Sequence, residues 1–267
     1  MTLALTRPRP LPDLARLWTD APAFTATALL AVLGLIPLFA AMSLDTRLFQ
    51  DENVWIKPIK FHMALAIYLT TLAFFARYMP ENTRKTRLWR GFALVVCACV
   101  LAEMLWIGGA AAAQTASHFN TANPAMAIIY GLMGLFAVTL TSASLVMGIS
   151  VWRNADSGLP APLHLSIALG LTLTFVLTVV VAGYMSSTGS HFVGTSTRTL
   201  ALMGWSRDAG DLRVPHFLAT HALHALPLIG LVASRGVVLL AAAAYAALVT
   251  GTFAQAISGL PFLPWLG

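Results

Sequence analysis

The chain has 267 residues, of which 58% are hydrophobic and only 10% are charged. Because an ordinary soluble domain carries about 25% charged residues, this composition excludes a soluble globular protein and predicts an integral membrane protein. The formal net charge of +6 does not indicate nucleic-acid binding, since most basic residues lie in short connections beside apolar runs, where they fit a topology signal and contacts with anionic membrane lipid.

Apolar runs of membrane-spanning length follow one another along the chain. A helix needs about 20 consecutive apolar residues to cross the hydrocarbon layer. The predicted spans are 22–43, 60–79, 91–113, 125–152, 163–187, 214–234 and 237–258. Only short connections remain between most of them, so we predict an all-α fold with one transmembrane domain over residues 1–267, a bundle of seven helices.

The basic residues predict how the bundle is oriented. Ten of the sixteen lysines and arginines lie in the amino-terminal segment and in the three connections on the same side of the bundle. The positive-inside rule therefore places the amino terminus inside and the carboxyl terminus outside. The first apolar run is longer than a signal-peptide core, so we interpret it as a retained span. The expected location is the bacterial cytoplasmic (inner) membrane.

The connection before the sixth predicted span is the longest in the chain. It covers about 188–213 and mixes charged residues with glycines and aromatics. Its charged residues are Arg198, Arg207, Asp208, Asp211 and Arg213. Long loops within compact domains commonly carry function, so we predict a structured lid over the outer mouth of the bundle.

Three histidines lie in the sixth predicted span, in the sequence PHFLATHALHALP. An ionisable side chain at membrane depth generally faces a bundle interior or a wet cavity, because an unsatisfied polar group is costly in hydrocarbon. At about 100° per residue, His216 and His224 fall on one stripe of the helix, with His221 about 60° from His224. All three rings can therefore face one interior, as ligands, as proton-handling groups or as structural hydrogen bonds between helices.

Counting residues from the span ends separates the histidines by depth. Those expected near the outer face come from four segments and are His62, His118, His191 and His216. At about 1.5 Å per residue, His221 and His224 lie about 10 and 15 Å below that face. Glu103 reaches a depth similar to that of His224. Since a buried carboxylate needs a proton or a hydrogen-bonded partner, we predict that Glu103 pairs with His224.

Imidazole is a common ligand of haem iron, copper, zinc and non-haem iron. For a b-type haem, His216 is the best-placed axial ligand. Its candidate partners at matching depth are His62, His118 and His191. Arg213 or Lys57 is available for an anionic group such as a haem propionate.

A compact site for copper, iron or zinc is an alternative to haem. One possible ligand set consists of His118, His191 and His216. The other consists of His221, His224 and Glu103. The residues do not distinguish between these two sets or between a metal and a haem.

The leading functional hypothesis is a membrane oxidoreductase or metal-dependent enzyme, in which Glu103, His221 and His224 are catalytic and a quinone or another lipid-soluble molecule is the partner. A proton-coupled carrier is the alternative, in which the same three residues relay protons or bind a substrate at midplane depth. A third hypothesis is a non-catalytic accessory subunit that binds other membrane subunits of a larger complex.

Two known families share the predicted helix count. Retinal proteins carry a Schiff-base lysine in the last span, and 237–258 contains no lysine. Zinc amidohydrolases of the alkaline ceramidase and adiponectin receptor type have a similar orientation, a late HxxxH pair and an intramembrane aspartate. This chain instead has HxxxxHxxH in 214–234 and no aspartate in any predicted span, so an intramembrane zinc hydrolase is a more distant alternative.

Overall fold

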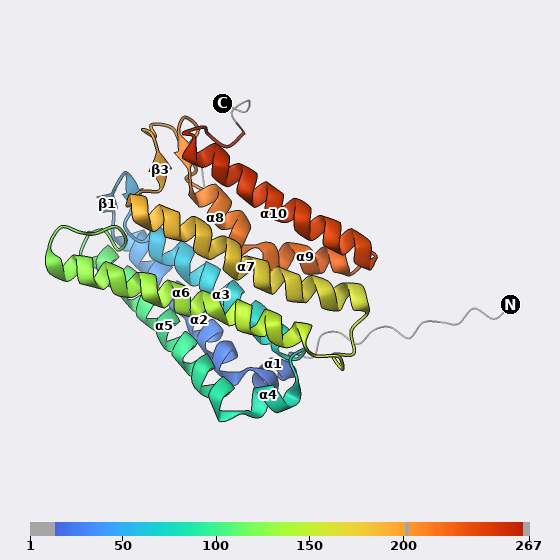
Figure 1. Ribbon diagram of the computed structural model, residues 1–267. Coiled ribbons are helices and arrows are strands. Elements are labelled where there is room, and N and C mark those ends of the chain that lie inside the picture. Colours follow the sequence, from blue (N-terminus) through green and yellow to red (C-terminus); the bar gives the residue numbers. More distant parts are fainter. Residues whose placement is uncertain (1–13, 201–202, 264–267) are drawn as a thin grey trace.

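Six long apolar helices form most of the computed structural model, which describes residues 14–200 and 203–263. They are α2 (Pro22–Leu44), α3 (Ile56–Ala76), α5 (Arg87–Ala112), α6 (Pro124–Trp152), α7 (Ala161–Thr188) and α10 (Arg235–Ile257). Each is long and apolar enough to cross a membrane, and together they form a helical bundle (Figure 1). The structure is therefore consistent with the predicted all-α membrane bundle.

The run predicted as the sixth span is not one continuous helix. It forms α8 (Arg213–Thr220) and α9 (Ala222–Gly230), which are separated at His221. Within the described residues, six helices have spanning length where the sequence predicts seven. The prediction and the structure differ because side chains of other helices form hydrogen bonds with the backbone groups at the break. Hydropathy along the sequence does not reveal such bonds.

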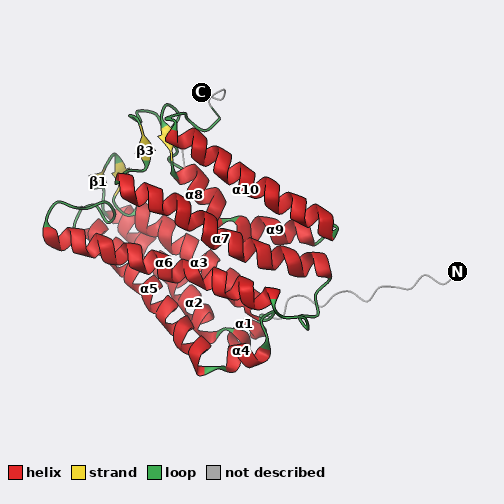
Figure 2. Cartoon of the chain, viewed as in Figure 1, coloured by secondary structure: helices red, strands yellow, loops and turns green. Residues whose placement is uncertain are grey.

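Short elements lie at the two ends of the bundle (Figures 1 and 2). The strands β1 (Leu48–Phe49), β2 (Glu52–Asn53), β3 (Phe192–Val193) and β4 (Gly210–Asp211) lie at one end, and α1 (Ala15–Asp20) and α4 (Glu81–Lys85) lie at the other. Two antiparallel pairs form, β1 with β2 and β3 with β4. We call the strand-bearing end the lid end, because the connection between α7 and α8 folds there.

Helix ends coincide with local capping signals. The Thr86 hydroxyl accepts a hydrogen bond from the Trp89 N–H at 3.1 Å, and the Asn123 side chain accepts one from the Met126 N–H at 3.0 Å. Both caps satisfy amide groups that the first helical turn leaves free. At the end of α7, Gly189 adopts a φ of 63°, a left-handed conformation that favours glycine.

Close packing around α7 positions the broken helix. This helix packs against α6, α8, α9 and α10, while α2 packs against α3. A Cβ atom on Gly170 would lie 2.9 Å from the carbonyl oxygen of Ala222, and one on Gly230 would lie 2.0 Å from Oγ of Ser166. Small residues thus allow α7 and α9 to approach closely, as is common in membrane bundles. The core residues around this contact include Leu69, Leu72, Val96, Val100, Met147, Leu171 and Leu223.

Hydrogen bonds order the described residues of the lid, 188–200 and 203–213, as its length and composition predict. The Asp208 carboxylate accepts hydrogen bonds from the Thr197 N–H at 3.0 Å, from the Thr197 hydroxyl and from the Ser206 hydroxyl at 3.0 Å. The Leu212 N–H donates to the His191 carbonyl oxygen at 2.9 Å. These bonds hold the lid against the entry to α8.

Candidate functional site

Two of the predicted outer histidines meet around a single phenylalanine at the lid end. The Phe119 ring lies 4.9 Å from the His191 ring and 6.5 Å from the His118 ring, and Phe61 of α3 lies 5.5 Å from His118. Phe119 has a φ of 56°, which is costly for a bulky side chain and is compensated by this packing. Three segments distant in sequence therefore converge here, as the depth analysis predicts for His118 and His191.

The lid-end histidines have few hydrogen-bond partners. His118 Nδ1 lies 3.0 Å from the Ser117 hydroxyl, and His191 Nδ1 lies 3.4 Å from the Met185 sulfur. His216 Nδ1 is buried and has no hydrogen-bond partner within the described part of the chain. A buried polar atom without a partner is uncommon in a folded protein and commonly indicates a missing water, ion or ligand.

The positive charge of Lys57 acts on both His118 and His191. Burial, together with smaller contributions from Lys57, His191 and His216, lowers the pKa of His118 to about 3. Burial likewise lowers the pKa of His191 to about 4, with contributions from Arg213 and Lys57. His118 and His191 are therefore neutral at physiological pH, because desolvation and nearby positive charge both disfavour the imidazolium form.

Glu103 of α5 faces the same lysine. Its side chain is only 3% exposed, and its Oε1 atom has no hydrogen-bond partner in the described residues. Lys57 interacts with Glu103 electrostatically, but their charged atoms form no ion pair within 4.0 Å among the described residues. We call Lys57, Glu103, His118, His191 and His216 together the Lys57 site.

The predicted pairing of Glu103 with His224 is wrong. The ionisable partner of Glu103 is Lys57, and none of the interactions of His224 involves Glu103. The physical reason is that α3 begins at Ile56, before the predicted span, so Lys57 lies in its first turn and reaches into the bundle. The sequence interpretation places Lys57 outside the predicted span 60–79, because a charged residue next to an apolar run usually marks the end of that run.

His62 does not face the lid-end histidines. Its Nδ1 atom lies 2.9 Å from the Pro58 carbonyl oxygen, and a Cβ atom on Gly34 of α2 would lie 2.9 Å from its Cδ2 atom. The ring is therefore packed between α2 and α3. Among the described residues, the contacts of His62 are with Pro58 and Gly34, and none joins it to His216, its predicted partner in haem ligation.

The Arg213 guanidinium forms its hydrogen bonds with other residues of the lid. Its Nε and Nη2 atoms donate to the Asp211 carboxylate at 2.9 and 2.6 Å, Nη2 also donates to the Gly204 carbonyl oxygen, and the guanidinium lies 4.7 Å from the Phe192 ring centre. The Asp211 side chain is fully buried and also accepts from the Ser206 N–H at 2.8 Å. Arg213 therefore neutralises Asp211, which leaves less of its charge for the predicted anionic ligand.

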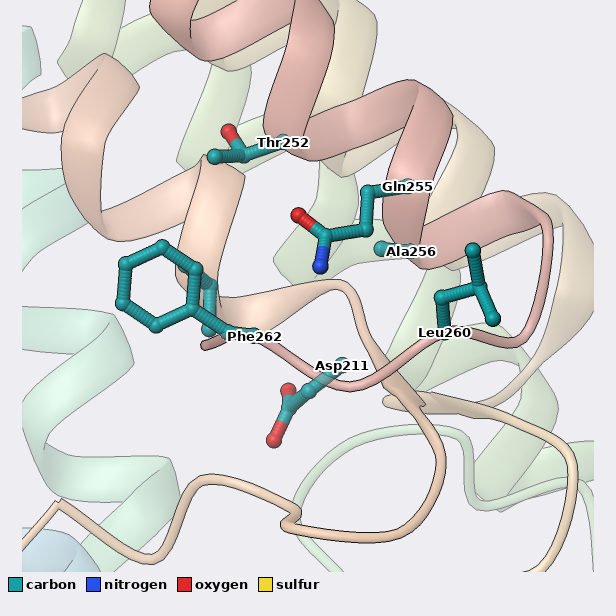
Figure 3. A pocket seen from close by; sticks show the side chains of 7 residues that line it. Asp211, Thr252, Gln255, Ala256, Leu260 and Phe262 are labelled. Atoms are coloured by element: carbon teal, nitrogen blue, oxygen red, sulfur yellow. The ribbon is translucent and has the colours of Figure 1, made fainter. Parts of the chain in front are cut away.

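The lid is also fastened to α10. Asp211 of β4, Gln255 and Ala256 of α10, and Leu260 and Phe262 of the following segment line one crevice, and the Asp211 carboxylate points away from Gln255 (Figure 3). The crevice between these residues is too narrow for a ligand. This part of the lid is therefore structural, in contrast to the part that carries His191.

His221 and His224 form a second group at the helix break. Their Nδ1 atoms lie 3.0 Å apart, and His224 Nε2 lies 3.0 Å from the Thr71 hydroxyl of α3. Because the single Thr71 hydroxyl hydrogen is donated to the Ile67 carbonyl oxygen at 2.8 Å, His224 Nε2–H must donate to Thr71. His224 Nδ1 is then the acceptor, and His221 donates from its own Nδ1.

Side chains of two other helices complete the backbone bonding at the break. The Tyr245 hydroxyl of α10 donates to the Leu218 carbonyl oxygen at 2.7 Å, and the Leu223 N–H donates to the Thr174 hydroxyl of α7 at 2.9 Å. In a membrane, freed backbone groups must be satisfied in this way. The break at His221 is therefore a supported feature of the fold.

Replacing Thr174 with valine is expected to destabilise the protein by about 1–3 kcal/mol, because it leaves the buried Leu223 N–H without an acceptor. Thr178, one turn further along α7, is the matched control, since its buried hydroxyl has no partner in the described part of the chain. Thermal unfolding in detergent, followed by circular dichroism, should show a loss for Thr174→Val and none for Thr178→Val. Equal losses would contradict this role of Thr174.

The described part of the chain contains no preassembled metal site. Within residues 14–200 and 203–263, no three His, Cys, Asp or Glu side chains lie close enough to hold a metal ion. The two predicted ligand sets are therefore not assembled, and the zinc-hydrolase alternative has no ligand set either. These sets comprise His118, His191 and His216, and His221, His224 and Glu103.

An apolar hollow of about 290 Å³ lies between α1, α2 and α3. Its lining includes Trp18, Leu29, Val32 and Ala73, and none of its lining residues is ionisable. The hollow thus lacks groups for acid–base chemistry or metal binding, and the chemically active residues are those at the lid end and at the helix break.

Comparison with known proteins finds no matching family model, no matching curated protein and no matching solved structure. The function must therefore be argued from the residues of the chain itself.

Proposed function

We propose that the protein is a proton-coupled carrier of a bacterial inner membrane, in which Glu103 binds and releases the proton. The observation that carries this proposal is the buried Glu103 carboxyl group, whose Oε1 atom has no hydrogen-bond partner in the described residues although Lys57 lies near it. An ionised carboxylate in such a place is costly unless it is paired. Glu103 can thus bind a proton when Lys57 is engaged elsewhere and release it when Lys57 is free.

The broken helix supports a carrier. Transporters commonly bind substrates and coupling ions at discontinuous helices near the middle of the membrane. In this chain α8 and α9 together form the seventh crossing that we propose, with His221 and His224 at the break. Following the distribution of basic residues, we propose that the lid end faces outward and the end with α1 and α4 faces the cytoplasm.

The proposal is tested by uptake into proteoliposomes, with and without an imposed pH gradient. Suitable labelled probes are lactate, glycine and glucose, which represent acids, amino acids and sugars. We expect wild-type protein to accumulate one of these classes only when the gradient is present, and Glu103→Gln to lose at least 90% of that gradient-dependent uptake. Glu81→Gln is the matched control, because Glu81 is an exposed carboxylate paired with Lys85 in α4.

Two results would contradict a proton-coupled carrier. One is uptake by Glu103→Gln that still responds fully to the pH gradient. The other is a wild-type protein that accumulates none of the three classes above the level of protein-free liposomes.

A haem- or metal-dependent membrane oxidoreductase with a quinone partner is the second candidate. It is favoured by the unpartnered Nδ1 atom of His216 beside the neutral rings of His118 and His191, because a b-type haem needs only one or two imidazole ligands. An optical spectrum and metal analysis of the purified wild type, beside His118→Ala, His191→Ala and His216→Ala, would decide. A haem or stoichiometric metal that one of these variants loses would support this candidate, and colourless, metal-free protein would exclude it.

A further inference from the structure

The Lys57 site contains one ammonium group, that of Lys57 itself. The nearest described carboxyl group that interacts with Lys57 is Glu103, and no ion pair joins them within 4.0 Å. The neighbouring cation, Arg213, is bonded to the fully buried Asp211 carboxylate and adds little net charge. The half-buried Lys57 ammonium group, which no carboxylate holds at ion-pair distance, can therefore bind an entering anion.

Neutral imidazoles supply further hydrogen bonds in the same place. His118 and His191 each engage Nδ1 with a neighbouring side chain, and their Nε2 atoms make no hydrogen bond within the described residues. His216 contributes a buried Nδ1 atom without a partner there. Neutral imidazole donates from one nitrogen, so these rings can orient an anion without adding charge.

Aromatic rings form an apolar wall beside the lysine. Phe61 lies one helical turn after Lys57 on α3, on the same face, and its ring contacts that of His118 at 5.5 Å between centres. Phe119 lies between His118 and His191. A ligand whose charged group meets Lys57 would therefore meet apolar surface with the rest of its structure.

We propose that the Lys57 site binds a small organic monocarboxylate, with its carboxylate on Lys57 and its apolar part against Phe61 and Phe119. The single ammonium group of Lys57 matches a single negative charge, whereas a phosphate dianion would bring a second charge with no partner. This inference rests on the proposed carrier and names its substrate class. When the carboxylate engages Lys57, the Glu103 carboxyl group loses its counter-charge and takes up the proton that travels with the substrate.

The test is equilibrium binding of benzoate to detergent-solubilised full-length protein, measured by isothermal titration calorimetry. Benzamide is the neutral control of nearly equal shape, and inorganic phosphate is the dianion control. We expect saturable benzoate binding and at least 10-fold weaker binding of benzamide and phosphate. We also expect at least 10-fold weaker benzoate binding to Lys57→Met, and unchanged binding to Lys60→Met, because Lys60 is an exposed α3 residue facing Glu52.

The binding and uptake measurements distinguish between failure of the site and failure of the carrier. Equal binding of benzoate and benzamide, or unchanged benzoate binding by Lys57→Met, would overturn the monocarboxylate site. If circular dichroism and size exclusion show that Lys57→Met does not fold, two other variants test the site. Lys57→Arg should retain benzoate binding, and His216→Ala should weaken it. Loss of binding in Lys57→Arg with unchanged binding in His216→Ala would overturn the proposal. Benzoate binding without gradient-dependent uptake would keep the site and refute the carrier, whereas gradient-dependent uptake of glycine or glucose without benzoate binding would refute the site alone.

Discussion

Replacing Arg213 with methionine is expected to destabilise the protein by about 3–5 kcal/mol, because it leaves a fully buried Asp211 carboxylate without a counter-charge. Methionine keeps much of the side-chain volume but removes the donors from Nε and Nη2. The lid should then separate from the bundle before the helices unfold. Thermal unfolding in detergent by circular dichroism, together with limited proteolysis of the lid, measures both effects.

A charge-matched control separates this effect from a general loss of positive charge. Arg198 is an exposed arginine of the same lid, and the described contacts give its side chain no carboxylate partner. Arg198→Met should therefore leave the unfolding midpoint nearly unchanged. In the double variant Arg213→Met with Asp211→Asn, part of the lost stability should return, because the buried charge is gone. A single variant Arg213→Met as stable as Arg198→Met would refute this account.

Replacing Gly210 with alanine is also expected to destabilise the protein, in this case through a steric overlap between β4 and α10. A Cβ atom at this position would lie 2.0 Å from the carbonyl oxygen of Ala256 and 2.9 Å from its carbonyl carbon. Both are backbone atoms of α10, so no rotation of a side chain can relieve the overlap. Overpacking that forces a backbone shift costs about 1–3 kcal/mol and occasionally more, and we expect a loss of about 3 kcal/mol here.

The control for this substitution is another glycine of the same region. Gly251 lies in α10, and a Cβ atom there would meet nothing within 4 Å. Gly251→Ala should match or exceed the wild type in thermal stability, since alanine favours a helix over glycine. The lid packing described for Gly210 would be refuted by a Gly210→Ala protein that unfolds at the same temperature as Gly251→Ala.

The bundle and the lid could be predicted because each depends on composition over a long stretch. The grouping of His118, His191 and His216 could also be predicted, since depth along a helix follows from counting residues. Periodicity gives the face of one helix but does not identify the helix that packs against it. His62 was therefore expected opposite His216, although its ring faces Gly34 of α2.

The break at His221 depends on residues that no local pattern connects to it. Thr174 bonds to a backbone group 49 residues away, and Tyr245 bonds to one 27 residues away. A local signal was present in Pro227, which lies inside α9 and removes one backbone donor, but proline alone does not place the break. The sequence indicates Lys57 as a possible partner of an anionic group but does not indicate its interaction with Glu103, because a charge next to an apolar run usually marks the membrane boundary.

The hydrogen-bond chain at the helix break has only one open end. A proton that arrives at Nε2 of His221 can pass through the paired Nδ1 atoms to His224, whose own Nε2–H points to Thr71. The Thr71 hydroxyl donates its hydrogen bond to a backbone carbonyl oxygen. A backbone carbonyl group is too weak a base to hold a proton. The histidine pair can therefore take up a proton but cannot pass it on through Thr71. A proton bound by the pair must leave through Nε2 of His221, the atom by which it entered.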